Sequence, residues 1–73
     1  MSSIEEVVRE LLLAHVEDPK GLDQPLELPS LALVTLAEEL EHEFSFVVTA
    51  RDLKPENFST LARIISFVEG HLS

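Results

Sequence analysis

The sequence predicts an all-α protein: a small four-helix bundle with a long first loop and a short third helix. Apolar residues recur at helical spacing in three segments of the chain. Prolines and small polar residues mark the places where these segments begin and end. The 73 residues, 45% of them hydrophobic, suffice for one thin core. We therefore expect residues 1–73 to form a single domain.

The first helix is predicted over Ser3–Val16. Five apolar side chains follow the spacing i, i+3, i+4, i+7 and i+8 along one face: Ile4, Val7, Val8, Leu11 and Leu12. Ser3 and Glu6 stand three positions apart, as in a capping box, and Glu5 and Glu6 suit the positive start of a helix. We therefore expect Ser3 to cap this helix.

The next segment, Glu17–Pro29, predicts a long ordered loop. It contains three of the four prolines, and each proline removes a backbone donor and disfavours helix in the residue before it. A turn is expected at Pro19–Gly21. The leucines of the loop, Leu22, Leu26 and Leu28, are expected to hold it against the core.

The second helix is predicted over Ser30–Phe44, with Ser30 as its N-cap. Its apolar stripe is expected to be widened by Leu31 and Val34, and otherwise consists of Leu33, Leu36, Ala37, Leu40 and Phe44. The remaining faces carry four glutamates: Glu38, Glu39, Glu41 and Glu43. No lysine or arginine lies in this helix.

After this helix, Ser45–Val48 has strand-forming residues but no second strand to pair with, so an extended connection is predicted. Thr49–Leu53 is expected to form one helical turn, with Thr49 capping it and Asp52 at the third position. Pro55 should end that turn. Each of these elements is short, and the last helix follows.

Ser59 is expected to cap a last helix that runs through His71. Its apolar stripe consists of Leu61, Ile64, Ile65, Val68 and Leu72. The bulky core groups are expected to be the four phenylalanines, Phe44, Phe46, Phe58 and Phe67. Packing the three stripes against one another in a compact helical bundle buries all of them.

The formal net charge of -9 argues against binding to nucleic acid, because an acidic protein is repelled by phosphate backbones. The chain has no cysteine, which excludes disulfides and thiolate zinc sites. No apolar run approaches the length of a membrane span. These features predict a cytoplasmic protein without membrane insertion, and the absence of a spare apolar stripe predicts a monomer.

Catalysis and metal binding are both poorly supported by the sequence. The three histidines, His15, His42 and His71, lie near the ends or outer faces of predicted helices and are expected to face solvent. None belongs to a nucleophile motif, and no segment has the ligand spacing of a calcium loop. We therefore expect no enzymatic activity and no metal site.

The acidic second helix has two interpretations, as does the serine at its start. The glutamates can form a solvated face, but like charges such as Glu39 and Glu43 at i, i+4 repel, and no basic residue of the helix relieves them. That cost favours, weakly, an electrostatic docking surface. Ser30 can be a simple cap, or a point of covalent attachment, because a helix start stabilises a bound phosphate.

Taken in order, these features resemble the acyl carrier protein family over nearly the whole chain. The stretch LPSL at Leu28–Leu31 is similar to the serine-leucine motif that opens the family's second helix, and LALVTLAEELEHEF is similar to that helix. LKPENFSTLARIISFV resembles its third turn and final helix. No single motif is specific, and the spacing of the elements carries the resemblance.

The resemblance implies that Ser30 carries a covalent 4'-phosphopantetheine arm, which a phosphopantetheinyl transferase adds from coenzyme A. The arm would hold acyl intermediates as thioesters in fatty acid or polyketide biosynthesis. The residues implied in docking acyl-transfer and condensing enzymes with basic patches are Glu27, Leu31, Glu38, Glu39, Glu41 and Glu43. Apolar residues such as Leu36, Val48, Leu53 and Ile65 would either shelter an acyl chain or belong to the core.

Two positions depart from the family. Pro29 stands where an aspartate usually precedes the serine, and Ser45 replaces the usual glycine, so this helix is expected to end differently. Two alternatives stay open beside the acyl carrier, and Pro29 favours the second of them. One is an aminoacyl, peptidyl or D-alanyl carrier, and the other is a carrier-like interaction module that is never modified.

Overall fold

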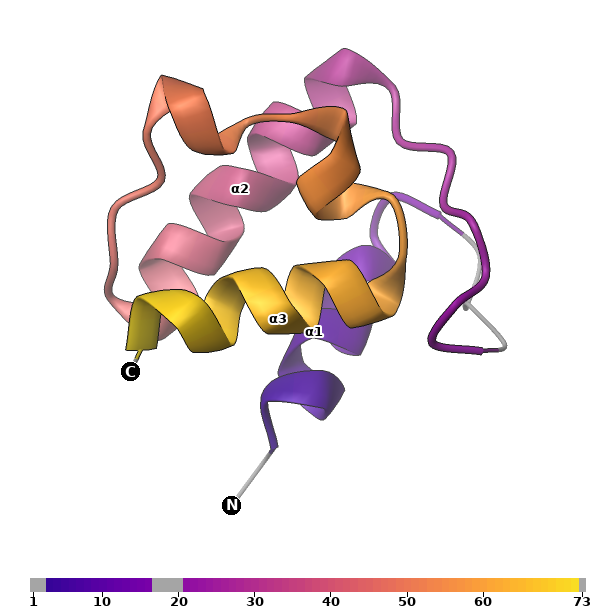
Figure 1. Ribbon diagram of the computed structural model, residues 1–73, viewed down its shortest axis with the longest axis horizontal. Helices are drawn as coiled ribbons and strands as arrows, with labels where there is room; N and C mark the ends of the chain where they lie inside the picture. The colour runs from indigo at the N-terminus through magenta and orange to yellow at the C-terminus, as the bar shows by residue number, and fades with distance from the viewer. Residues whose placement is uncertain (1–2, 17–20, 73) are drawn as a thin grey trace.

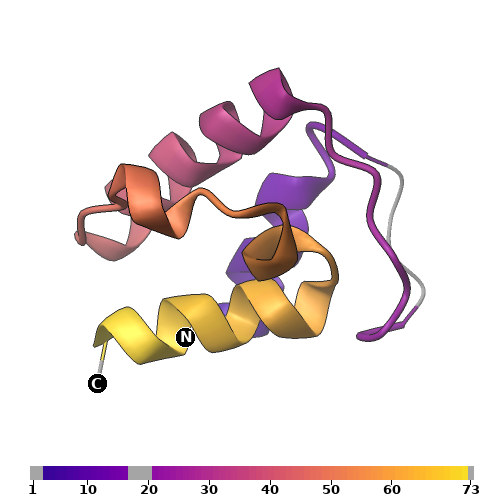
Figure 2. The ribbon, with the colours of Figure 1, turned by 45° about the horizontal axis from the view of Figure 1, so that its top comes forward.

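The computed structural model describes residues 3–16 and 21–72. It contains three α-helices and no strand within these residues: α1 (Ile4–Leu12), α2 (Ser30–Phe44) and α3 (Leu61–Leu72). Figure 1 shows α1 crossing behind α3 and α2 lying above α3, and in both Figures 1 and 2 the C-terminal ends of α2 and α3 lie at the same side of the molecule. The all-α class is confirmed.

The short third helix is not an α-helix. Two 3-10 turns stand in its place, η1 (Ala50–Asp52) and η2 (Pro55–Phe58). Pro55 begins the second turn rather than only ending the first, because its fixed φ suits a first helical position. The predicted connection over Ser45–Val48 contains no helix or strand, but its first residue, Ser45, is a turn residue with a left-handed backbone rather than an extended one.

The core is formed where the three helices and η2 meet. Its largest fully buried side chain is Phe58, and its other members are Val8, Leu12, Leu36, Ala37, Leu40, Leu61, Ile64 and Val68. The other three phenylalanines are half-buried and pack against this cluster. The predicted stripes are thus confirmed at their centres, and burial of these groups supplies the main favourable free energy of folding.

Several predicted edges of the stripes were wrong. Leu31 is 80% exposed, and Val34 and Leu72 are also exposed. These residues lie at the sides or ends of their helices, where no other element of the described chain covers them. The apolar face of α2 is therefore narrower than the sequence suggested.

The first helix begins as predicted and ends early. Ser3 caps it, since the Ser3 hydroxyl accepts a hydrogen bond from the Glu6 N–H at 3.2 Å. The α-helix ends at Leu12, and a turn replaces the four residues expected to extend it to Val16. In that turn the His15 and Val16 N–H groups both donate to the carbonyl of Leu12 at 2.9 Å.

The described part of the first loop is fastened to the start of α3 by backbone hydrogen bonds. The Ala62 N–H donates to the Leu22 carbonyl at 3.0 Å, and the Leu26 N–H donates to the Ser59 carbonyl at 2.8 Å. Leu26 and Leu28 pack against the core as predicted, but Leu22 is exposed, so it holds the loop through its backbone. The predicted turn at Pro19–Gly21 lies largely outside the described residues.

The start of α3 differs from the prediction by one residue. The hydroxyl of Thr60, rather than Ser59, caps the helix, because it accepts a hydrogen bond from the Arg63 N–H at 3.1 Å. The Ser59 hydroxyl instead donates to the carbonyl of Glu56 in η2 at 3.1 Å. Both residues were suitable caps, and the geometry of η2 decides which of them enters the helix.

The end of α2 was also predicted wrongly. Ser45 adopts the left-handed conformation, with φ of 57° and ψ of 48°, although it has a Cβ. The Ser45 and Phe46 N–H groups both donate to the Glu41 carbonyl, as in a glycine-terminated helix. The helix therefore ends in the same way as a helix with glycine at this position, and the left-handed conformation strains the backbone of Ser45.

Candidate functional site

Ser30 is the first residue of α2, and its side chain is exposed. The prediction that Ser30 caps the helix was wrong, because Pro29 occupies the N-cap position with φ of -59° and ψ of 155°. The Pro29 carbonyl accepts the N–H of Leu33 at 2.9 Å. Among the described residues, no partner binds the Ser30 hydroxyl, so it stays available to another molecule.

The first turn of α2 offers an anion an uncontested position. Proline has no side-chain acceptor, so no side chain caps the first N–H groups, and the first turn contains no acidic residue. A helix of 15 residues presents a partial positive charge at this end. The exposed Ser30 oxygen therefore lies where a helix start favours a phosphate ester electrostatically.

An apolar surface lies directly beside the serine. Leu31 is 80% exposed and Val34 is 40% exposed, and they stand three positions apart on one side of α2. The Thr35 hydroxyl donates a hydrogen bond to the Leu31 carbonyl at 3.0 Å, so the donor of this nearby polar side chain is already satisfied within α2. Within α2, Ser30 is thus followed by exposed aliphatic side chains.

The four glutamates of α2 divide into two pairs. Glu38 and Glu43 are exposed, and Glu27 in the preceding loop is exposed as well. Glu39 and Glu41 are half-buried and engaged within the molecule. Glu41 Oε2 accepts the N–H of Val48 at 2.7 Å, which fastens the connection after α2 to the side of that helix. Only part of the predicted acidic surface is therefore free to contact a partner.

Glu39 is paired with a histidine that the sequence placed in solvent. His15 Nε2 donates to Glu39 Oε1 at 2.7 Å, and only 14% of the His15 side chain is exposed. This contact joins the turn after α1 to the middle of α2. No basic residue within α2 contacts Glu39, and the group that does, His15, lies on another element.

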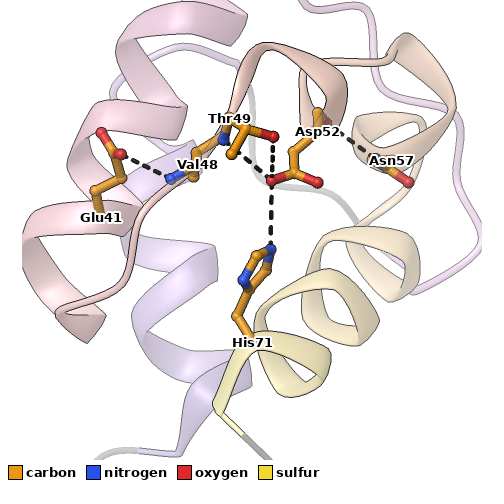
Figure 3. A network of polar contacts seen from close by, with 6 residues as sticks. All are labelled: Glu41, Val48, Thr49, Asp52, Asn57 and His71. Carbon is orange, nitrogen blue, oxygen red and sulfur yellow. Dashed lines mark hydrogen bonds and ion pairs between the residues drawn. The ribbon is translucent and has the colours of Figure 1, made fainter.

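A second group of polar contacts lies at the opposite end of α2 from Ser30, and Figure 3 shows it. Asp52 Oδ2 accepts both the N–H and the hydroxyl of Thr49 at 3.0 Å, which confirms the predicted pairing within this turn. The Asp52 carbonyl accepts from the Asn57 amide at 2.9 Å. His71 Nε2, from the last turn of α3, lies 3.6 Å from Asp52 Oδ2.

The contacts of Asp52 stabilise its charged form. The backbone N–H of Thr49 holds the pKa of Asp52 below its usual value, with further contributions from the Thr49 hydroxyl and from the positive charges of His71 and Lys54. The Asp52 carboxylate has a structural role, because its hydrogen bonds to Thr49 close the η1 turn. Sequence reasoning identified Asp52 but had no signal for His71, which is 19 positions further along the chain.

The residues considered for sheltering an acyl chain belong to the hydrophobic interior. Leu36 is fully buried in the core, while Val48, Leu53 and Ile65 are half-buried and pack against it. A hollow of about 420 Å³ lies elsewhere, beside the end of α1, and is lined by Val16, Gln24, Pro25, Leu26 and Glu27. The hollow is open and touches none of the four residues.

The described residues contain no helix long and apolar enough to cross a membrane. They also contain no group of three or more histidine or carboxylate side chains placed to hold a metal ion. Comparison with protein-family models, with curated proteins and with solved structures finds no match to this chain. The function must therefore be inferred from the residues and contacts described above.

Proposed function

We propose that this protein is an acyl carrier whose Ser30 hydroxyl holds a 4'-phosphopantetheine arm. The observation that carries the proposal is the exposed, unbonded hydroxyl of Ser30 at the first residue of α2, where no side chain competes for the helix N-terminus. The finer fold proposed with it is a carrier bundle in which η1 and η2 together replace a short third helix. The protein itself performs no catalysis.

Attachment requires a separate transferase. A base of that enzyme would remove the Ser30 proton, and the serine oxygen would attack the pyrophosphate of coenzyme A. A new oxygen–phosphorus bond forms, the pyrophosphate bond breaks and the nucleotide part of coenzyme A leaves. When attached, the arm supplies a thiol on which acyl groups are carried as reactive thioesters. The first-turn N–H groups of α2 would stabilise the phosphodiester beside Ser30.

Partner enzymes would dock on α2 through a mixed surface. We propose that Leu31 enters an apolar socket, while Glu38, Glu43 and Glu27 meet cationic groups of the partner. Each exposed ion pair contributes about 0–1 kcal/mol, so several together orient the partner and still release it quickly. Glu39 and Glu41 add negative charge, but their internal contacts hold them in place.

Incubation with coenzyme A and a broad-range phosphopantetheinyl transferase tests the proposal by intact mass. We expect a single covalent addition to the wild-type chain and none to Ser30→Ala. Ser66→Ala, which changes an exposed serine in the middle of α3, is the matched control and should be modified normally. No addition to the folded wild type, or an addition that persists in Ser30→Ala, would exclude Ser30 as the attachment point.

One alternative function is favoured by a specific observation. Pro29 leaves the first turn of α2 without the carboxylate that the resembling family places before its serine. This feature favours an interaction module that is never modified. The mass experiment separates the two, because only a carrier gains the arm. An aminoacyl carrier would also gain it, and is distinguished by which group a subsequent enzyme transfers to the thiol.

A further inference from the structure

The nine residues 45–53 follow α2, include η1 and end just before Lys54 and η2, and none of them has a fully buried side chain. Phe46, Val48 and Leu53 are half-buried against the core, and Val47 is 71% exposed. Figures 1 and 2 show the segment leaving the end of α2 and passing along the side where α2 and α3 end together. Moving it away would uncover these three half-buried side chains, but none of the nine fully buried core residues belongs to the segment.

Both ends of this segment have backbone conformations outside the helical and extended regions. Ser45 is left-handed, a conformation that costs an L-residue free energy, and any movement that lets its φ become negative releases that strain. Leu53 has φ of -80° and ψ of 50°. These two residues are the positions where rotation can swing the segment as a whole.

The turn within the segment is closed by its own hydrogen bonds. Asp52 Oδ2 accepts the N–H and hydroxyl of Thr49, and the Asp52 N–H donates to the Thr49 carbonyl at 3.0 Å. None of these bonds involves α1, α2 or α3. The turn can therefore keep its shape when the segment leaves the helices.

Apart from the apolar packing of Phe46, Val48 and Leu53, which includes the Phe46 and Phe67 rings at 6.0 Å, and the Phe46 N–H on the Glu41 carbonyl, few contacts join the segment to the helices. The Val48 N–H donates to the Glu41 carboxylate of α2. At α3, His71 lies 3.6 Å from Asp52, and the ring centroids of Phe46 and His71 lie 4.7 Å apart (Figure 3 shows the polar part). The His71 ring therefore holds the segment at two points, since it meets both its aromatic side chain and its carboxylate.

We propose that residues 45–53 form a strap that opens as a unit while the three helices stay folded, and that His71 is its latch. The strap pivots at Ser45 and Leu53, carries the Thr49–Asp52 turn with it and breaks the bond of Val48 to Glu41. This movement does not depend on the carrier function and occurs whether or not Ser30 bears a group.

Native-state hydrogen exchange of the full chain, measured by NMR at urea concentrations below unfolding, tests the proposal. The Val48 amide reports the strap, and the buried Val68 reports the core. We expect Val48 to exchange faster than Val68 and with a clearly smaller urea dependence, because opening the strap exposes only part of the surface that global unfolding exposes. If Val48 instead follows the urea dependence of Val68, only global unfolding exposes it, and the strap does not exist.

His71→Phe tests the latch, because it keeps an aromatic ring and removes the ion pair. Exchange at Val48 should rise about two- to fivefold, the effect of losing one exposed ion pair. His42→Phe is the matched control, since it makes the same substitution at an exposed histidine of α2. It should leave the exchange rate of the Val48 amide unchanged. An unchanged Val48 rate in folded His71→Phe would overturn the latch.

Ser45→Gly gives a second test that does not risk the fold. Glycine removes the strain of the closed form, so Val48 should exchange about two- to fivefold more slowly than in the wild type. Equal or faster exchange in this variant would show that Ser45 is not a pivot.

Discussion

The division of the α2 glutamates leads to a prediction about stability. Each of Glu38, Glu39, Glu41 and Glu43 is replaced singly by alanine, so the change in helix propensity is similar at every position. Glu41→Ala removes the acceptor of the Val48 N–H at 2.7 Å. A hydrogen bond to a charged group contributes about 1.5–3 kcal/mol, and partial exposure brings the expected loss to about 1–2 kcal/mol.

The expected change in stability at the other three glutamates depends on whether each one has a partner within the chain. Glu39→Ala removes the contact with His15, whose side chain is largely covered, and we expect a loss of about 1 kcal/mol. Glu38→Ala and Glu43→Ala remove exposed groups and should change stability by less than about 0.5 kcal/mol. In all four variants, removing one negative charge relieves repulsion between the glutamates and raises the free energy of unfolding by a few tenths of a kcal/mol, which offsets part of each loss.

Urea unfolding followed by circular dichroism measures these differences, with the midpoint compared at constant slope. Use of the variants by the enzymes that the proposed carrier function requires is measured in parallel. Glu38 and Glu43 variants should lose partner use and keep stability, whereas the Glu41 variant should lose stability. Four equal changes in unfolding free energy would refute the division, because they would mean that the internal contacts contribute nothing.

Three further predictions concern caps and charge. Ser45→Gly should raise the unfolding free energy by about 0.5–1 kcal/mol, whereas the same change at exposed Ser66 should lower it, and urea midpoints compare the two. Thr60→Ala should lower stability by about 1 kcal/mol and Ser59→Ala by less, since the Thr60 hydroxyl caps α3; equal effects would contradict this. Because the folded pKa of Asp52 is lowered, its contribution to stability is present above its unfolded pKa of about 3.9 and lost as pH falls through the folded value. In Asp52→Asn, the urea midpoint should therefore fall less steeply as the pH is lowered than it does in the wild type. An equally steep fall would show that Asp52 does not cause this loss of stability.

The sequence predicted the fold where local signals agreed. The bounds of α2 were correct because Pro29 excludes helix before it and an apolar stripe with helical period follows. The end of α1 was missed because no glycine or proline marks it, and the contact of His15 with Glu39 draws the chain away after Leu12. Ends that depend on tertiary contacts carry no local signal.

The site could be predicted only in part for the same reason. Ser30 and Glu38 were identified from their own positions in a helix, and the structure leaves both exposed. Glu39 and Glu41 look identical to Glu38 in the sequence, but their partners lie 24 and 7 positions away. Whether a charge faces a partner enzyme or another residue of the same chain depends on packing, which the period of a helix does not specify.

Pro29 affects the proposed function in two opposite ways. Pro29 stands where the family that this chain resembles has an aspartate before the serine. Without that carboxylate, recognition by a transferase that needs it is weaker. Pro29 also takes the N-cap position and moves Ser30 into the first helical position, so the serine hydroxyl does not act as the cap. Pro29→Asp would supply a carboxylate that can itself cap the helix. If the missing carboxylate limits modification, this variant should gain the arm faster than the wild type in the mass assay. If the free helix N-terminus is what matters, the new carboxylate should compete with the phosphate for the same N–H groups, and modification should slow.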